Sequence, residues 1–123
     1  METDFLTQKV IGCAVAVHKE LGPGLWGSSY EHCLYYELNI QGIATRQQVA
    51  LPVRYKSITI DVGYRLVLLI EESLIVELKA VDKLTNIHLA QMMTYLKLSG
   101  IKTGLIINFN VSKLVNVIKR VSL

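Results

Sequence analysis

The chain has 123 residues, of which 51% are hydrophobic and 19% charged, with a formal net charge of +3. This composition excludes a disordered chain, and the length suits residues 1–123 as a single domain rather than two. Scattered lysines and arginines at this mild charge permit contact with nucleic acid but do not indicate it.

Helical periodicity predicts two helices near the N-terminus, over 4–21 and 28–41. The first is stopped by Gly22-Pro23-Gly24, and the second begins with Ser28 as N-cap. Both cysteines, Cys13 and Cys33, lie in these helices. We expect them to be small buried side chains in a reducing compartment rather than a disulfide.

Alternating patterns predict three antiparallel strands, over 49–55, 58–70 and 74–80, joined as a meander. Pro52 lacks a backbone donor and places the first of them at an edge of the sheet. The second strand alternates over its whole length, so its even-numbered residues should share one face.

The C-terminal third predicts a helix over 87–99, capped by Asn86 and closed by Gly100. It is apolar on two sides, which is typical of a helix packed between layers. A buried strand over 103–109 follows, parallel to 74–80 in a βαβ unit. The tail from 112 to 121 fits a helix and an edge strand equally well. We therefore expect an α/β fold, with a mixed four- or five-stranded sheet flanked by helices.

Two charged side chains interrupt the apolar strand 74–80. Glu77 and Lys79 share one face of it because strand side chains alternate. Buried charge is costly without a partner, so this pair needs a reason. If Ile70 pairs with Leu74 across the turn at 71–73, position 67 lies directly opposite Glu77. An acid there would complete a cation site, but the chain has Val67.

The complete pattern resembles the GxxExxY family of the PD-(D/E)XK nuclease superfamily. The resemblance covers nearly the whole chain and is carried by VHKELGPGL at 17–25, YEHCL at 30–34, GYRL at 63–66, IVELKAV at 75–81, HLAQMMTYLKLSG at 88–100 and GLIINFNV at 104–111.

This resemblance implies a nuclease-like core and a site for Mg²⁺ or Mn²⁺. In the superfamily, two acids and a backbone carbonyl hold the metal, and a lysine orients water or stabilises the phosphate. Glu77, Lys79 and Gln91 match the catalytic positions, and the carbonyl is that of Leu78. Carboxylate-held Mg²⁺ supplies the charge and the activated water that phosphodiester cleavage needs.

Two acids of the family pattern are absent. Tyr30 matches the last residue of the name-giving motif, but its glutamate falls at Gly27 and the strand acid at Val67. Metal held by Glu77 and one carbonyl would be weak. Glu31, which lies one helical turn after Gly27, or Glu20 before the Gly-Pro-Gly turn could replace the lost acid, ahead of Asp61.

Further side chains are candidates for the border of the site. Arg65 and His88 are possible accessory residues beside Tyr30 and Glu31. Trp26 is a candidate plug for the space left by the missing glutamate. The sequence has no His/Cys cluster with zinc spacing. It also has no phosphate-cradling loop, since no G-K-[ST] follows Gly22-Pro23-Gly24.

Three functions remain open on the sequence alone. The first is a degenerate nuclease-fold domain that no longer cuts and either binds nucleic acid or serves as a protein-interaction module. The second is an active Mg²⁺-dependent DNA or RNA endonuclease or exonuclease with a relocated acid. The third is a structural homodimeric interaction module. No apolar run reaches the roughly 18 residues of a membrane span, and the acidic N-terminus METDFLTQKV is unlike a signal peptide, so we expect a cytoplasmic protein.

Overall fold

The structure is a computed structural model that describes residues 3–113 and 118–123. In chain order its elements are α1 (Thr3–Leu21), α2 (Gly27–Ile40), β1 (Thr45–Ala50), β2 (Val53–Tyr55), β3 (Ile58–Ile60), β4 (Arg65–Ile70), β5 (Leu74–Lys79), α3 (Asn86–Ser99), β6 (Thr103–Asn108) and β7 (Ile118–Ser122).

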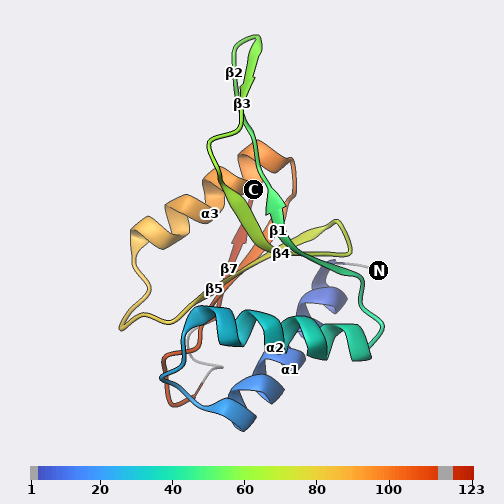
Figure 1. Ribbon diagram of the computed structural model, residues 1–123, viewed down its shortest axis with the longest axis vertical. Helices are drawn as coiled ribbons and strands as arrows, with labels where there is room; N and C mark the ends of the chain where they lie inside the picture. Colours follow the sequence, from blue (N-terminus) through green and yellow to red (C-terminus); the bar gives the residue numbers. More distant parts are fainter. Residues whose placement is uncertain (1–2, 114–117) are drawn as a thin grey trace.

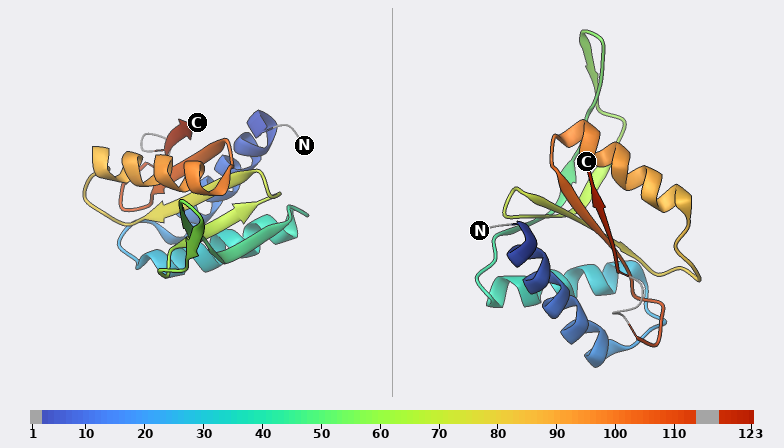
Figure 2. Two further views of the ribbon diagram at one scale, coloured as in Figure 1. Left: turned by 90° about the horizontal axis from the view of Figure 1, so that it is seen from above. Right: turned by 180° about the vertical axis from the view of Figure 1, so that it is seen from behind.

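Five of the strands form one mixed sheet with the order β1-β4-β5-β6-β7. β5 and β6 are parallel, and the other neighbours are antiparallel. Helices α1 and α2 lie on one face of this sheet and α3 on the other (Figures 1 and 2). The predicted α/β class and the mixed, helix-flanked sheet are confirmed.

Each face of the sheet carries its own hydrophobic core. The core on the α1–α2 side includes Leu6, Val10, Leu34, Leu38, Leu68, Val76 and Phe109. The core under α3 includes Leu66, Leu69, Ile75, Met92, Tyr95, Leu96 and Ile106. Burial of apolar side chains on both faces explains why β6 reads as a continuous apolar run, as the sequence predicted for a parallel strand.

The predicted strand 58–70 is wrong as a single element. It divides into β3 and β4, because the Asp61 side chain accepts a hydrogen bond of 3.0 Å from the Gly63 backbone and Gly63 adopts a φ of 89°. An aspartate that binds the backbone two residues on makes a local turn, and this turn interrupts the strand. The predicted strand 49–55 divides in the same region, into β1 and β2.

These breaks place β2 and β3 outside the main sheet. They pair only with each other among the described residues, as a hairpin that projects beyond α3 (Figure 1). The meander is therefore β1-β4-β5 within the main sheet, with β1 at the edge that Pro52 predicted. The even-numbered residues of 58–70 do not share one environment, since Ile58 is exposed, Leu66 lies under α3 and Leu68 faces α2.

Several helix ends differ from the expected ones. The N-cap of α2 is Trp26 rather than Ser28, and that of α3 is Thr85 rather than Asn86. Thr85 is preferred because its side chain and that of His88 form a reciprocal capping box. α3 is not packed between two layers, since Ile87 on its outer side is 75% exposed.

The C-terminal residues from 118 to 122 form a strand, so the strand alternative for the tail holds in its described part. Leu114, Val115 and Val117 lie outside the described residues. Cys13 and Cys33 are both free thiols. Among the described residues, no helix is long and apolar enough to cross a membrane.

Candidate functional site

The position of Glu77 is fixed by the register of β4 and β5. Ile70 pairs with Leu74, as expected, and the pairing continues to Leu68 with Val76. One step further, the backbone N–H of Val67 donates a hydrogen bond of 3.4 Å to Oε1 of Glu77. The carboxylate is therefore turned into the gap where β4 and β5 stop pairing.

Burial dominates the electrostatics of Glu77. Only 5% of its surface is exposed, and this desolvation raises the pKa of the carboxyl from 4.5 to about 7. The Val67 hydrogen bond and the charge of Lys79 lower the pKa by less, and the charge of Glu31 raises it further. Near neutral pH the group therefore exists as a mixture of acid and carboxylate.

Glu31 is the second buried carboxyl of this region. It lies on the face of α2 that covers the sheet and is 8% exposed. Gln47 donates a hydrogen bond of 3.0 Å to Oε2, and Gln48 donates bonds of 3.0 and 3.1 Å to both oxygens. The two amides satisfy this carboxylate without a cation.

The backbone of Gln48 makes this double contact possible. Neighbouring strand residues normally point to opposite faces, yet Gln47 and Gln48 both reach Glu31. Gln48 has a φ of 52°, in the left-handed region that a non-glycine residue seldom adopts. Neither glutamine could be identified from the sequence, because neither their long-range pairing with α2 nor this local twist leaves a periodic signal.

We expect Gln48→Ala to lower the free energy of unfolding by about 2 kcal/mol, since it removes bonds to a carboxylate and keeps the strained backbone. Gln48→Gly should cost only about 1 kcal/mol, because glycine adopts a positive φ freely. Urea unfolding at neutral pH measures both. At Gln47, which has no positive φ, the order should be reversed, with glycine worse than alanine. A Gln48→Gly variant that is less stable than the Gln48→Ala variant contradicts the strain argument.

Lys79 lies at the end of β5 and is partly buried. It pairs with Asn108 on the parallel strand β6. The backbone N–H of the next residue, Phe109, donates a hydrogen bond of 2.8 Å to the Lys79 carbonyl oxygen. The Asn108 side chain is 1% exposed and binds both the N–H and the carbonyl of Val81, at 3.1 and 2.9 Å. Asn108 thus fixes the chain just beyond Lys79, a positioning role that leaves no signal in the sequence pattern.

Gln91 and Tyr95 lie on α3 above the same region. Gln91 is exposed and donates a hydrogen bond of 2.9 Å to the Tyr95 hydroxyl. Burial raises the pKa of Tyr95, and the charge of Glu77 raises it further, so the two side chains are close enough to interact electrostatically. α3 thus contributes a polar pair at the border of the site.

The other candidate residues, Tyr30, His88 and Arg65, make contacts away from Glu77. Tyr30 is fully buried, stacks on Phe109 at 4.4 Å and donates a bond of 2.6 Å to Gly22 O, so its hydroxyl holds the loop before α2. His88 caps α3 through its bond from Thr85 N. Arg65 contacts Asp61 at 3.6 Å.

Positions 26 and 27 of the name-giving motif do not fill the space of the missing glutamate. Trp26 is 84% exposed, so it does not plug the space left by the missing glutamate. A Cβ built at Gly27 would meet no atom within 4 Å. Position 27 therefore has room for a side chain, one helical turn before Glu31.

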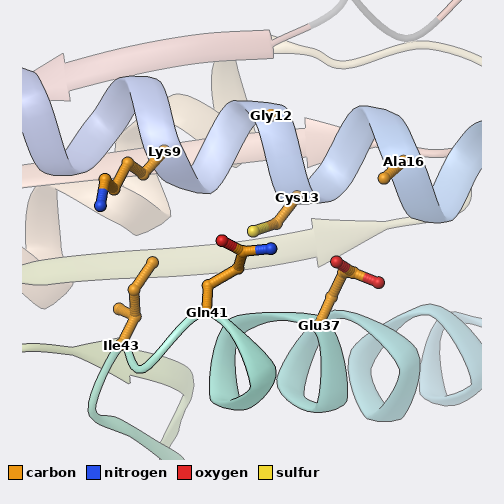
Figure 3. A pocket seen from close by; sticks show the side chains of 7 residues that line it. All are labelled: Lys9, Gly12, Cys13, Ala16, Glu37, Gln41 and Ile43. Atoms are coloured by element: carbon orange, nitrogen blue, oxygen red, sulfur yellow. The ribbon is translucent and has the colours of Figure 1, made fainter.

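A pocket of about 260 Å³ lies elsewhere, between α1 and α2. Figure 3 shows Cys13 from α1 beside Gln41, the residue that caps the end of α2, with Lys9 and Glu37 on either side. Burial and the charge of Glu37 raise the pKa of the Cys13 thiol, which disfavours the nucleophilic thiolate. This pocket therefore lacks an activated nucleophile and is separate from Glu77.

The mixed sheet, the flanking helices and the acid and lysine two residues apart on β5 define a nuclease-like α/β domain. The comparison with protein families supports this class directly, since the profile of the PD-(D/E)XK nuclease superfamily matches residues 4–121. The chain belongs to this superfamily. No curated protein and no solved structure matches it significantly.

Nucleases of this superfamily generally use Mg²⁺ or Mn²⁺. Among the described residues, no three His, Cys, Asp or Glu side chains form a group that could hold a metal ion. Glu77 offers one buried carboxyl that is partly protonated, and the Glu31 oxygens are occupied by amides. This donor set does not fit a firmly held divalent ion, which requires deprotonated ligands.

Proposed function

We propose that the chain is a GxxExxY-type member of the superfamily that has lost metal-dependent cleavage and retains nucleic-acid binding. The observation that carries this proposal is Val67. It stands where the resemblance requires an acid, and its backbone rather than a side chain contacts Glu77, at 3.4 Å.

The state of Glu31 supports the loss of cleavage. This residue is the best-placed substitute for the missing acid, but both of its oxygens accept hydrogen bonds from Gln47 and Gln48. A metal ion would have to displace these amides and deprotonate Glu77 at the same time. Both steps oppose binding, so the function that remains open to this surface is recognition of phosphate groups by its cations.

Lys79 and Arg65 are the cations that we assign to this recognition. Lys79 lies beside Glu77 on β5, and Arg65 is an exposed residue at the start of β4. Phosphate contacts of lysine and arginine supply affinity without sequence preference and weaken with salt. We therefore expect binding to be of modest strength and similar for different sequences.

Lys79→Ala is expected to weaken binding of short fluorescent DNA and RNA severalfold and to reduce the slope of log affinity against log salt by about one. Lys9→Ala is the matched control, since Lys9 lies in the α1–α2 pocket. Fluorescence anisotropy measures the binding, and gel electrophoresis with Mg²⁺ or Mn²⁺ measures cleavage. Equal affinities for both variants, or metal-dependent cleavage that Glu77→Ala abolishes, would contradict the proposal.

A second function is favoured by one observation. The charge of Glu31 raises the pKa of Glu77, so the two carboxyls lie close enough to interact. If metal displaces the glutamine amides, Glu31 and Glu77 would form the acid pair of an active nuclease. Mn²⁺-dependent cleavage that is lost in both Glu31→Gln and Lys79→Ala identifies this function.

A further inference from the structure

The hairpin of β2 and β3 is the part of the described chain that is least covered by the rest. It projects from the body beyond the end of α3 (Figures 1 and 2). Its strands pair over only three positions, from Val53 with Ile60 to Tyr55 with Ile58. A two-stranded hairpin is at best marginally stable in water unless another strand or layer covers it.

One face of this hairpin is apolar. Directly opposed residues share a face, so Val53 and Ile60 lie beside Tyr55 and Ile58, whereas Arg54 and Thr59 occupy the other side. Tyr55, Ile58 and Ile60 are 59%, 52% and 40% exposed. Val62 and Tyr64, beyond the end of β3, are also exposed, and the ring centroids of Tyr64 and Tyr95 on α3 are 6.3 Å apart. Contiguous exposed apolar side chains of this kind mark interaction sites.

The outer edge of β3 is open as well. Neither hairpin strand pairs with a further strand within the described ranges. Proteins commonly protect such edges with proline or charge. Pro52 stands just before β2, but β3 itself has the sequence Ile-Thr-Ile, with neither. The unprotected edge is therefore that of β3.

The charges of the hairpin are arranged for pairing with a copy of itself. Arg54 and Lys56 lie toward the tip, and Asp61 lies at the base. Two copies of β3 related by a two-fold axis run antiparallel, so the tip of each meets the base of the other. With the axis at Thr59, position 58 lies opposite 60 and position 57 opposite 61. Lys56 then lies diagonally across from Asp61 of the second copy, whose exposed carboxylate also contacts Arg65 of its own chain at 3.6 Å.

We propose that the chain forms a two-fold dimer in which β3 pairs with β3 of a second copy, giving a four-stranded sheet across the interface. The apolar side chains of both hairpins then form one continuous face, and Lys56 at each tip lies opposite Val62 of the other copy. The hairpin carries two cations and one anion on an aliphatic surface, which suits a protein partner better than nucleic acid. The dimer does not depend on the proposed function.

The mass of the full chain in solution tests the dimer. Light scattering should give twice the 13.8 kDa of one chain at micromolar concentration. Ile58→Lys with Ile60→Lys should give the single-chain mass with an unchanged circular dichroism spectrum. Ile87→Lys changes an exposed isoleucine on α3 in the same way and should leave the dimer intact.

Cysteine cross-linking tests the register. Thr59→Cys lies on the proposed axis, where opposed Cα atoms are about 5 Å apart and a disulfide forms readily. Ser57→Cys is offset by four residues from its own copy, or about 13 Å, and should not cross-link. The unmodified chain controls for Cys13 and Cys33. A monomer at all concentrations, a monomer that binds oligonucleotides through Arg54 and Lys56, or a dimer that cross-links at 57 and not at 59 overturns the proposal.

Discussion

The double variant Gly27→Glu and Val67→Asp is expected to bind Mg²⁺ and Mn²⁺, in contrast to the unmodified chain. At metal concentrations well above its dissociation constant, the variant should gain about 2 kcal/mol of stability, or roughly 8 °C in melting temperature. The reason is the donor set, since the two changes add carboxylates at the positions where the resemblance requires acids.

The structure has room for the change at position 27. A Cβ there meets no atom within 4 Å, and residue 27 is the first residue of α2. Glutamate at this end of a helix is favoured by the helix dipole and replaces a glycine of low helix propensity. Gly27→Glu alone should therefore be neutral or stabilising, which makes it a suitable control.

The effect of Val67→Asp on the stability of the protein should depend on whether metal is present. Val67 is half-buried and its backbone already contacts the Glu77 carboxyl. A second carboxylate beside Glu77, whose pKa is already raised to about 7 by burial, adds charge repulsion. Without metal, the Val67→Asp variant should therefore be less stable than the unmodified chain. A divalent cation between the two acids reverses this repulsion.

Differential scanning fluorimetry and calorimetry with Mg²⁺, Mn²⁺ and chelator measure these effects. Adding Glu77→Gln to the double variant should abolish the response to metal, because it removes one of the ligands. The idea fails if the unmodified chain already shows a response to metal that Glu77→Gln removes. It fails equally if the double variant folds but is indifferent to metal.

The sequence predicted the fold best where an unbroken apolar run or a short turn leaves a local signal. The apolar run of 103–109 indicated a parallel neighbour, and β6 is parallel to β5. The short turn at 71–73 predicted the pairing of Ile70 with Leu74, and with it the approach of Val67 to Glu77. Both features depend on local sequence alone, so they need no knowledge of the tertiary structure.

The features that were missed depend on tertiary contacts or on local turn chemistry. The alternating pattern continues through Asp61 and Gly63, so periodicity could not reveal the turn that separates β3 from β4. The amides of Gln47 and Gln48 meet Glu31 from 16 and 17 residues away. Only packing of α2 on the sheet brings them together, and this packing determines whether Glu31 is available to a metal.

The stability of the unmodified chain is expected to fall as the pH rises from about 5 to 8, because Glu77 is buried. Its pKa is about 7 in the folded state and near 4.5 when unfolded, so the folded state holds the proton more tightly. The resulting stability is fully present below pH 4.5 and is lost as the pH passes through about 7. A shift of this size corresponds to about 3 kcal/mol.

Glu77→Gln keeps the shape of the side chain and cannot ionise, so it should remove this loss. At pH 8 the variant should be more stable than the unmodified chain by up to about 3 kcal/mol, and at pH 5 by less than about 1 kcal/mol. Urea unfolding at several pH values measures the difference. Glu72→Gln is the matched control, because Glu72 is exposed and pairs with Arg46 at 2.7 Å, and it should leave the pH dependence unchanged. Equal slopes for the Glu77→Gln variant and the unmodified chain would show that the Glu77 carboxyl is hydrated in solution, and a hydrated carboxylate would again be available to a metal ion.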